Sequence, residues 1–130
     1  MAGQLTIDTL KASSGVLATQ NGMTGIAKAW VSYNGVAQTI SNSFNVSSVT
    51  YNTTGSYTVN FTTAMPNATY SILSTASNAP STSSVVMNCN ANSTGTIISP
   101  TTTSCLLFAQ SRSTGSGIDA AYIYVAVFSS

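Results

Sequence analysis

Residues that could perform acid–base, nucleophilic or metal chemistry are almost absent from this chain. Its 130 residues include only five charged ones, and neither histidine nor glutamate occurs. Catalysis by proton transfer, nucleophile activation and metal binding all draw mainly on those residue types. In their place stand 22 Ser, 20 Thr and 11 Asn, which form hydrogen bonds but do not titrate near neutral pH. The sequence therefore predicts a protein that assembles or binds, with no enzymatic activity, cofactor or metal.

Two pairs of residues remain as chemical candidates. Asp8 and Asp119 would supply the two carboxylates of a glycosidase only if the fold brought them together, and isolated acids in turns more commonly cap the backbone or lie in solvent. Cys89 and Cys105 stand in apolar segments, and two cysteines without a histidine cannot complete a structural zinc site. The N-terminus lacks the apolar run of a signal peptide, so we expect synthesis in a cytoplasm and reduced, buried thiols. A disulfide between neighbouring strands is the alternative.

The charge balance also bears on partners. A net charge of +1 provides no basic surface for nucleic acid, since three scattered cations cannot neutralise a run of phosphates. No stretch approaches the roughly 18 apolar residues of a membrane span, so we expect no membrane insertion. Near-zero net charge leaves little repulsion between copies, which favours self-association.

The elements that must position these residues have the periodicity of strands. Tyr57, Val59 and Phe61 alternate with polar residues, and no segment shows a sustained helical stripe. Turn signals such as Asn34-Gly35 recur at short spacing. We therefore predict an all-β fold, an antiparallel β-sandwich or jelly-roll-like domain over residues 25–130, with a short N-terminal arm or docking segment over residues 1–24.

Residues 105–109 and 121–128 break the alternation because they are apolar on both faces. One interpretation is a central strand covered on both sides within the domain. The other is a strand with one face in the core and the other against a neighbouring subunit. On the second interpretation the candidate interface with a neighbouring subunit or a larger assembly consists of Leu5, Ile7 and Leu10 of the arm together with Tyr122, Tyr124 and Phe128.

Polar loops are the candidate recognition surface, because loops on a rigid β scaffold commonly carry binding function. The loops are 78–84, 90–104 and 111–117, with candidate residues Asn78, Ser81, Thr82, Asn90, Asn92, Thr101 and Ser113. An alternative is an aromatic platform built from Trp30 and the tyrosines. Core and interface packing is the preferred explanation for these rings, particularly for Tyr57 and Tyr70.

Several segments resemble a domain of tailed-bacteriophage virion proteins, especially tail fibres and host-recognition proteins. They are GIAKAWV at 25–31, SFNVSSV at 43–49, GSYTVNFTTAMPNATY at 55–70, and Asp119 with VAVF at 125–128. The opening LTIDTLK at 5–11 is similar to the start of short fibre-like phage proteins. Residues from about 75 to 104 carry no such resemblance.

The resemblance implies a β-rich, non-enzymatic virion domain, commonly at the end of a fibre and usually trimeric. Expected partners are copies of itself, other capsid or tail proteins, and a host surface glycan or protein. In fibres this domain follows a long shaft, whereas here residues 1–24 precede it. The expected function is therefore a tail-fibre or receptor-binding module of the virion, made in the host cytoplasm. The alternative is a capsid decoration (cement) protein whose arm grips the shell.

Overall fold

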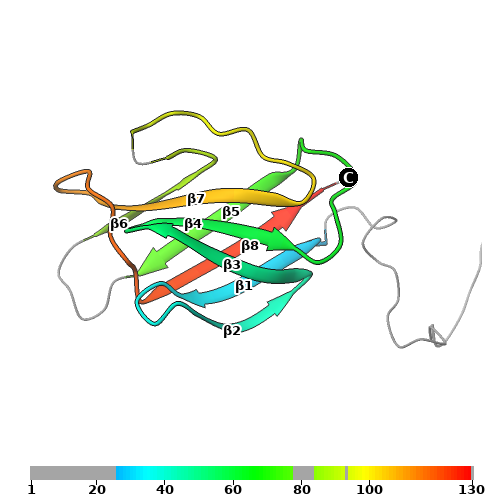
Figure 1. Cartoon of the computed structure of the whole chain (residues 1–130), viewed down its shortest axis with the longest axis horizontal. Coiled ribbons are helices and arrows are strands. Elements are labelled where there is room, and N and C mark those ends of the chain that lie inside the picture. The colour runs from blue at the N-terminus through cyan, green and yellow to red at the C-terminus, as the bar shows by residue number, and fades with distance from the viewer. Residues whose placement is uncertain (1–25, 78–83, 93, 130) are drawn as a thin grey trace, which may run out of the picture.

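The computed structural model of this chain describes residues 26–77, 84–92 and 94–129, which form an all-β fold without a helix (Figure 1). The expected arm at residues 1–24 lies outside these ranges. The strands are β1 (Ala29–Asn34), β2 (Thr39–Phe44), β3 (Val46–Thr53), β4 (Ser56–Phe61), β5 (Ser71–Ser77), β6 (Val85–Cys89), β7 (Ser104–Ser111) and β8 (Tyr122–Phe128). Within those residues no helix is long and apolar enough to cross a membrane.

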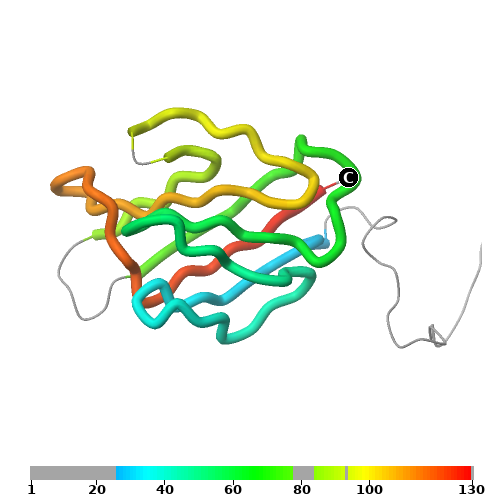
Figure 2. Tube along the Cα trace, viewed as in Figure 1, coloured from blue at the N-terminus to red at the C-terminus, as the bar shows by residue number. Residues whose placement is uncertain are grey.

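The strands form two four-stranded antiparallel sheets that face each other as a sandwich. Sheet A has the order β2-β1-β8-β5, and sheet B has the order β3-β4-β7-β6. The tube in Figure 2 shows that β1 begins and β8 ends at the same end of the sandwich, as their antiparallel pairing requires. The predicted all-β sandwich is thus confirmed.

Side-chain alternation explains why these segments form strands with one face in the core. In β4, Tyr57, Val59 and Phe61 are buried, while Thr58 and Asn60 on the other face are half-buried. Val, Thr and aromatic residues suit a pleated, half-buried surface, and Ser, Thr and Asn are unfavourable in a helix interior. The core between the sheets contains Ala29, Val31, Tyr33, Tyr57, Val59, Phe61, Met65, Tyr70, Cys105, Leu107, Ala109, Ala120, Ile123, Val125 and Val127.

Asn45 turns the chain from sheet A into sheet B. It adopts the left-handed conformation with φ of 53°, which Asn tolerates better than most residues. Its side-chain amide donates to the carbonyl oxygens of Lys28 and Thr63 over 3.0 and 3.1 Å, and its Oδ1 accepts the amide of Thr63 over 2.7 Å. One polar side chain therefore holds three segments together at this corner.

The two segments that are apolar on both faces have different explanations. In β7 the outward-facing Phe108 is only 1% exposed, because the loop before β8 covers it. A Cβ added to Gly117 of that loop would lie 3.2 Å from the Phe108 ring, so the contact is close. Phe108 is thus covered within the domain, whereas Leu106, which also faces outward from β7, is half-buried. Within the part of the chain that the structure describes, no loop covers the outward face of β8 in this way, and that face belongs to the surface described next.

Candidate interaction surface

The outer face of sheet A differs in chemistry from the part of sheet B formed by β3 and β4. On sheet B the outward residues of β3 and β4 are Ser, Thr and Asn, and they hydrogen-bond to one another. Asn60 Nδ2 donates to Ser48 Oγ and Thr50 Oγ1, each over 3.0 Å, and Asn52 Nδ2 donates to Thr58 Oγ1 over 2.9 Å. Such a ladder of neutral polar groups suits contact with water.

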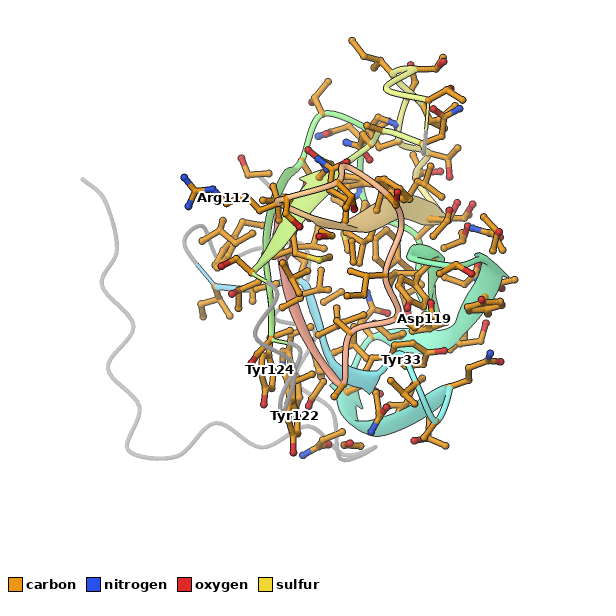
Figure 3. All side chains as sticks on the ribbon, turned by 90° about the vertical axis from the view of Figure 1, so that its left-hand side faces the viewer. Tyr33, Arg112, Asp119, Tyr122 and Tyr124 are labelled. Carbon is orange, nitrogen blue, oxygen red and sulfur yellow. The ribbon has the colours of Figure 1, made fainter. Side chains whose placement is uncertain are left out.

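Sheet A presents an apolar outer face instead. On β8, Ile123, Val125 and Val127 point into the core, so Tyr122, Tyr124, Ala126 and Phe128 point outward. Tyr122 is 50% exposed and Tyr124 is 48% exposed. Figure 3 shows both rings projecting from the same side of the molecule, away from Asp119 and Tyr33.

The pairing register extends this face across the sheet along one row of residues, while neutral polar residues of the same face lie beside it, namely Ser32, Asn42, Ser71, Thr75 and Ser77. Trp30 of β1 lies opposite Ala126 on one side and Phe44 of β2 on the other. Leu73 of β5, which is 60% exposed, also lies opposite Ala126. We call the outward residues Trp30, Phe44, Leu73, Tyr122, Tyr124, Ala126 and Phe128 the apolar face. A contiguous apolar patch on a folded protein typically marks an interaction site.

The apolar face is also free of charge. None of the four strands of sheet A contains an acidic or basic residue. Covering this surface would therefore bury no charge, which is the costly part of desolvating a protein surface. The predicted interface residues Tyr122, Tyr124 and Phe128 all belong to this face, whereas Leu5, Ile7 and Leu10 lie outside the described residues.

The predicted recognition residues do not gather at one site. The β7–β8 connection, which holds Ser113, lies at the same end of the sandwich as the β1–β2 turn, whereas the β6–β7 connection starts at the opposite end. Asn78, Ser81 and Thr82 lie outside the described residues.

Two of the loop side chains serve their own turns. Asn92 Oδ1 accepts the amides of Thr94 and Thr96 over 3.0 and 2.9 Å. Thr101 Oγ1 accepts the amides of Thr103 and Ser104 over 3.2 and 3.0 Å. Asn90 adopts φ of 55°, and its buried Oδ1 has no hydrogen-bond partner among the described residues. These side chains shape the β6–β7 loop more than they present groups to a ligand.

Three of the six tyrosines, Tyr33, Tyr57 and Tyr70, occupy the core, as the sequence indicated for Tyr57 and Tyr70. Tyr57 is fully buried and meets the ring of Tyr33 edge-on, with centroids 5.5 Å apart. Burial and the nearby Asp119 carboxylate raise the pKa of both hydroxyl groups. Tyr70 is buried against Phe61 and donates to the carbonyl oxygens of Thr101 and Ser104, each over 2.8 Å.

Asp119 is held by this tyrosine cluster. Its Oδ1 accepts the Gly55 amide and the Tyr57 hydroxyl, each over 2.8 Å, and its Oδ2 accepts the Tyr51 hydroxyl over 3.2 Å. These bonds tie the β3–β4 turn to the segment that leads into β8. Asp8, its expected partner in a glycosidase, lies outside the described residues. No group of three or more metal-ligating side chains occurs in the described ranges.

Both cysteines are free thiols. Cys89 lies opposite Leu107, two residues along β7 from Cys105, so the two cysteines are diagonal neighbours. Such neighbours stand roughly 7–8 Å apart, beyond the usual reach of a disulfide. Burial raises the pKa of the Cys105 thiol to about 12, with the neighbouring Cys89 thiol as the lesser cause.

A groove of about 570 Å³ was not predicted from the sequence. It is lined by residues of three strands, namely Ile72, Leu73, Ser74 and Thr75 of β5, Met87 and Cys89 of β6, and Tyr124, Val125 and Ala126 of β8. No local sequence pattern predicts this groove, because β6 belongs to sheet B and meets β5 and β8 of sheet A only in the folded chain.

Comparisons of this chain with protein-family models, curated proteins and solved structures find no match.

Proposed function

We propose that this chain is a non-enzymatic structural subunit of a tailed-phage particle that assembles with copies of itself. Within the particle it acts as a tail-fibre or receptor-binding module. The virion assignment rests on the resemblance of residues 25–31, 43–49 and 55–70 to phage host-recognition domains. The assembly rests on one observation, the uncharged apolar face of sheet A opposite the polar ladder of sheet B.

The physical drive for assembly is the removal of this face from water. Burial of apolar surface contributes about 25 cal/mol per Å², so exposed rings such as Tyr122 and Tyr124 would contribute most of the stabilisation. Tyrosine suits this role because its hydroxyl group can find a partner at the rim of an interface. The chain as a whole has a net charge of +1, so repulsion between copies is weak.

The non-enzymatic assignment is supported by how Asp119 is used. Its carboxylate accepts three hydrogen bonds from Gly55, Tyr57 and Tyr51, so its oxygens are engaged by the fold. A carboxylate held in this way secures a turn and is poorly placed to exchange protons with a substrate.

A capsid decoration protein is the second candidate function. It is favoured by the β6–β7 loop, where Asn92 and Thr101 satisfy backbone groups of their own turns. A receptor-binding loop would keep more of these groups available. Both candidates require the same self-assembly.

The assembly part is tested by sedimentation velocity of the full chain. We expect the wild-type protein to form a discrete oligomer, and Tyr122→Ser with Tyr124→Ser to shift it to monomers at the same concentration. Val86→Ser is the matched control, because Val86 points outward from sheet B and is also partly exposed. A wild-type monomer at 100 µM would contradict the proposal, as would an oligomer that the double variant leaves intact.

The virion part is tested on phage particles. Exchange of loop 78–84 or loop 90–104 should abolish specific adsorption if the chain is a receptor-binding module, and unchanged adsorption would contradict that function. Removal of residues 1–24 should instead reduce particle integrity, with adsorption intact on the surviving particles, if the chain is a decoration protein. Labelling the protein in intact virions would then locate it on the shell or on the tail.

A further inference from the structure

The outward residues of β5 and β8 are matched in size across the strand pair. The two strands pair antiparallel in an unbroken register along their whole length, and every second pair of residues points outward. In each of these four outward pairs one side chain is large and its neighbour on the other strand is small. With the large residue given first, the pairs are Phe128 with Ser71, Leu73 with Ala126, Tyr124 with Thr75, and Tyr122 with Ser77.

The large residue changes strand at one pair only. On β8 the outward side chains are aromatic rings, interrupted by Ala126. On β5 they are small and carry hydroxyl groups, interrupted by Leu73. Leu73 is 60% exposed and stands directly beside Ala126, whose side chain ends at Cβ. We call Leu73 the knob and the depression at Ala126 the hollow.

The hollow has larger side chains on every side. Trp30 of β1 and Leu73 of β5 flank Ala126 across the sheet. Tyr124 and Phe128 flank it along β8. Leu73, Tyr124 and Ala126 also line the groove of about 570 Å³, which agrees with a depression at this point. A knob beside a hollow of this kind makes the surface complementary to a second surface of the same shape.

We propose that two copies of the chain pack the outer faces of β5 and β8 against each other about a two-fold axis that runs along these strands and between them. Such an axis places β5 of one copy over β8 of the other. Leu73 of each copy then inserts over Ala126 of the second copy, so both insertions are made at once, as in any two-fold contact. The inference deepens the proposed self-assembly and rests on it.

The remaining outward pairs fit the same axis. Each aromatic ring of β8 faces a serine or threonine of the second copy's β5, so large side chains meet small ones along the whole contact. Sheets packed face to face interdigitate their side chains in this way, and alternation of large and small residues fills the layer without voids. Thr75 and Ser77 also place hydroxyl groups near Tyr124 and Tyr122, which gives the buried phenol groups neutral hydrogen-bond partners.

A second copy is the occupant that this pattern favours. The match of large with small residues lies within one pair of strands, so it becomes a match between molecules only when the same surface faces itself. Neither β5 nor β8 contains an acidic or basic residue, so the contact buries no charge and brings no like charges together.

Exchange of the knob and the hollow tests the arrangement. Ala126→Leu gives each copy two knobs, and Leu73→Ala gives each copy two hollows. We expect sedimentation velocity of the full chain to show an association constant at least about tenfold weaker for each variant. The double variant again has one knob beside one hollow, so its association constant should return to within about threefold of the wild-type value. Val36→Ala is the matched control, because Val36 is 64% exposed in the turn between β1 and β2 and should not affect association.

A mixture of the two single variants provides a second readout. A copy with two knobs fits a copy with two hollows, whereas like copies clash or leave a void. We therefore expect native mass spectrometry, with one variant isotopically labelled, to show mixed pairs enriched at least about tenfold over random mixing. Circular dichroism confirms that each variant is folded, and Ala126→Met takes the place of Ala126→Leu if the latter is not.

Restored association in the double variant together with preferred mixed pairs supports the proposal. If the double variant loses as much as the two single variants combined, or if an oligomeric wild-type protein is insensitive to both, the two-fold pairing is overturned while the proposed self-assembly stands. A discrete trimer would also overturn the pairing, because a two-fold contact generates even-numbered assemblies. A wild-type monomer at 100 µM would overturn both, since the face would then be covered by another part of this chain or by a different protein.

Discussion

The Tyr57 hydroxyl donates a hydrogen bond of 2.8 Å to Oδ1 of Asp119, across 62 positions of sequence. Tyr57 lies in β4 of sheet B, and Asp119 precedes β8 of sheet A. The same carboxylate oxygen accepts the Gly55 amide over 2.8 Å. The bond therefore links the two sheets at one end of the sandwich and fixes where β8 begins. The only acidic residue in the described ranges serves the fold at this point.

The first prediction concerns this carboxylate. Asp119→Ala leaves the Tyr57 hydroxyl and the Gly55 amide without their acceptor in a half-buried site. Unsatisfied buried donors cost roughly 1–3 kcal/mol each, so we expect the free energy of unfolding to fall by about 3 kcal/mol in urea titrations. Asp119→Asn keeps an acceptor oxygen and should lose about half as much. Equal free energies of unfolding for the wild-type protein, Asp119→Ala and Asp119→Asn would contradict a structural role for Asp119.

The second prediction concerns Gly55, which has φ of +77° in the β3–β4 turn. A Cβ added there would clash with the Ala109 carbonyl oxygen, a backbone atom that cannot move away without a shift of β7. Gly55→Ala thus combines a left-handed conformation, costing roughly 1–2 kcal/mol, with a steric clash. We expect at least twice the destabilisation of Gly115→Ala.

Gly115 is a matched control for this effect. It has a similar φ of +70°, but nothing lies within 4 Å of an added Cβ. Its substitution should cost only the conformational part, roughly 1–2 kcal/mol. If thermal and urea unfolding show equal losses for the two variants, the close packing around Gly55 does not contribute.

The third prediction is a loss of stability at alkaline pH. Burial raises the pKa of Cys105 from 9.0 to about 12, so the folded state keeps its proton over a range where the unfolded chain has lost it. The unfolded state then binds fewer protons, and the free energy of unfolding must fall as the pH rises through this window. The slope approaches about 1.4 kcal/mol per pH unit for one group.

Tyr57 and Tyr70 add to this loss at higher pH, because burial raises the pKa of each above 10.0. Burial raises the pKa of Tyr33 in the same direction, and tyrosines of the unfolded chain begin to ionise before pH 10. The contribution of Cys105 is therefore the difference between the wild-type protein and Cys105→Ala. We expect urea titrations of the wild-type protein between pH 9 and 10 to show a falling stability, and Cys105→Ala to show a flatter profile. Parallel profiles would mean that the thiol titrates alike in both states.

The strands and turns of this fold could be predicted from the sequence because their signals are local. Alternation of Tyr57, Val59 and Phe61 with polar residues predicts β4, and Asn34-Gly35 predicts the turn after β1. The two faces of β8 could not be told apart, since Ile123 and Tyr124 are both apolar. Their difference comes from pairing with β1 and β5, which is a long-range property.

The groove illustrates a stronger limit on prediction from sequence. Ser74 Oγ of sheet A lies 3.1 Å from Cys89 Sγ of sheet B. The spacing of these two residues in the sequence does not predict this contact. The turn-stabilising role of Asn92 and Thr101 could not be predicted either, because the side chains of Ser, Thr and Asn use the same groups to hydrogen-bond a turn and to bind a ligand. Composition alone predicted polar loops, but it did not predict which of their side chains would form hydrogen bonds with the loop backbone.

The last prediction separates the two outer faces by a single charge on each. Ser32 is half-buried on β1 and lies opposite Tyr124 on one side and Asn42 on the other, within the outer surface of sheet A. Ser32→Glu would place a carboxylate where packing against a neighbour removes water, and the effective penalty is several kcal/mol. Each 1.4 kcal/mol is about tenfold in affinity, so we expect sedimentation velocity to show an association constant at least 100-fold weaker than that of the wild-type protein.

Thr50→Glu is the control, because it adds the same charge to the outer face of sheet B, within the hydrogen-bonded ladder. It should leave the association constant within about threefold of the wild-type value. Both variants lower the net charge equally, from +1 to 0, so neither increases the repulsion between copies. A loss of assembly in both would mean that a carboxylate disturbs the fold or the assembly at either face, and only the asymmetric result identifies sheet A as the contact.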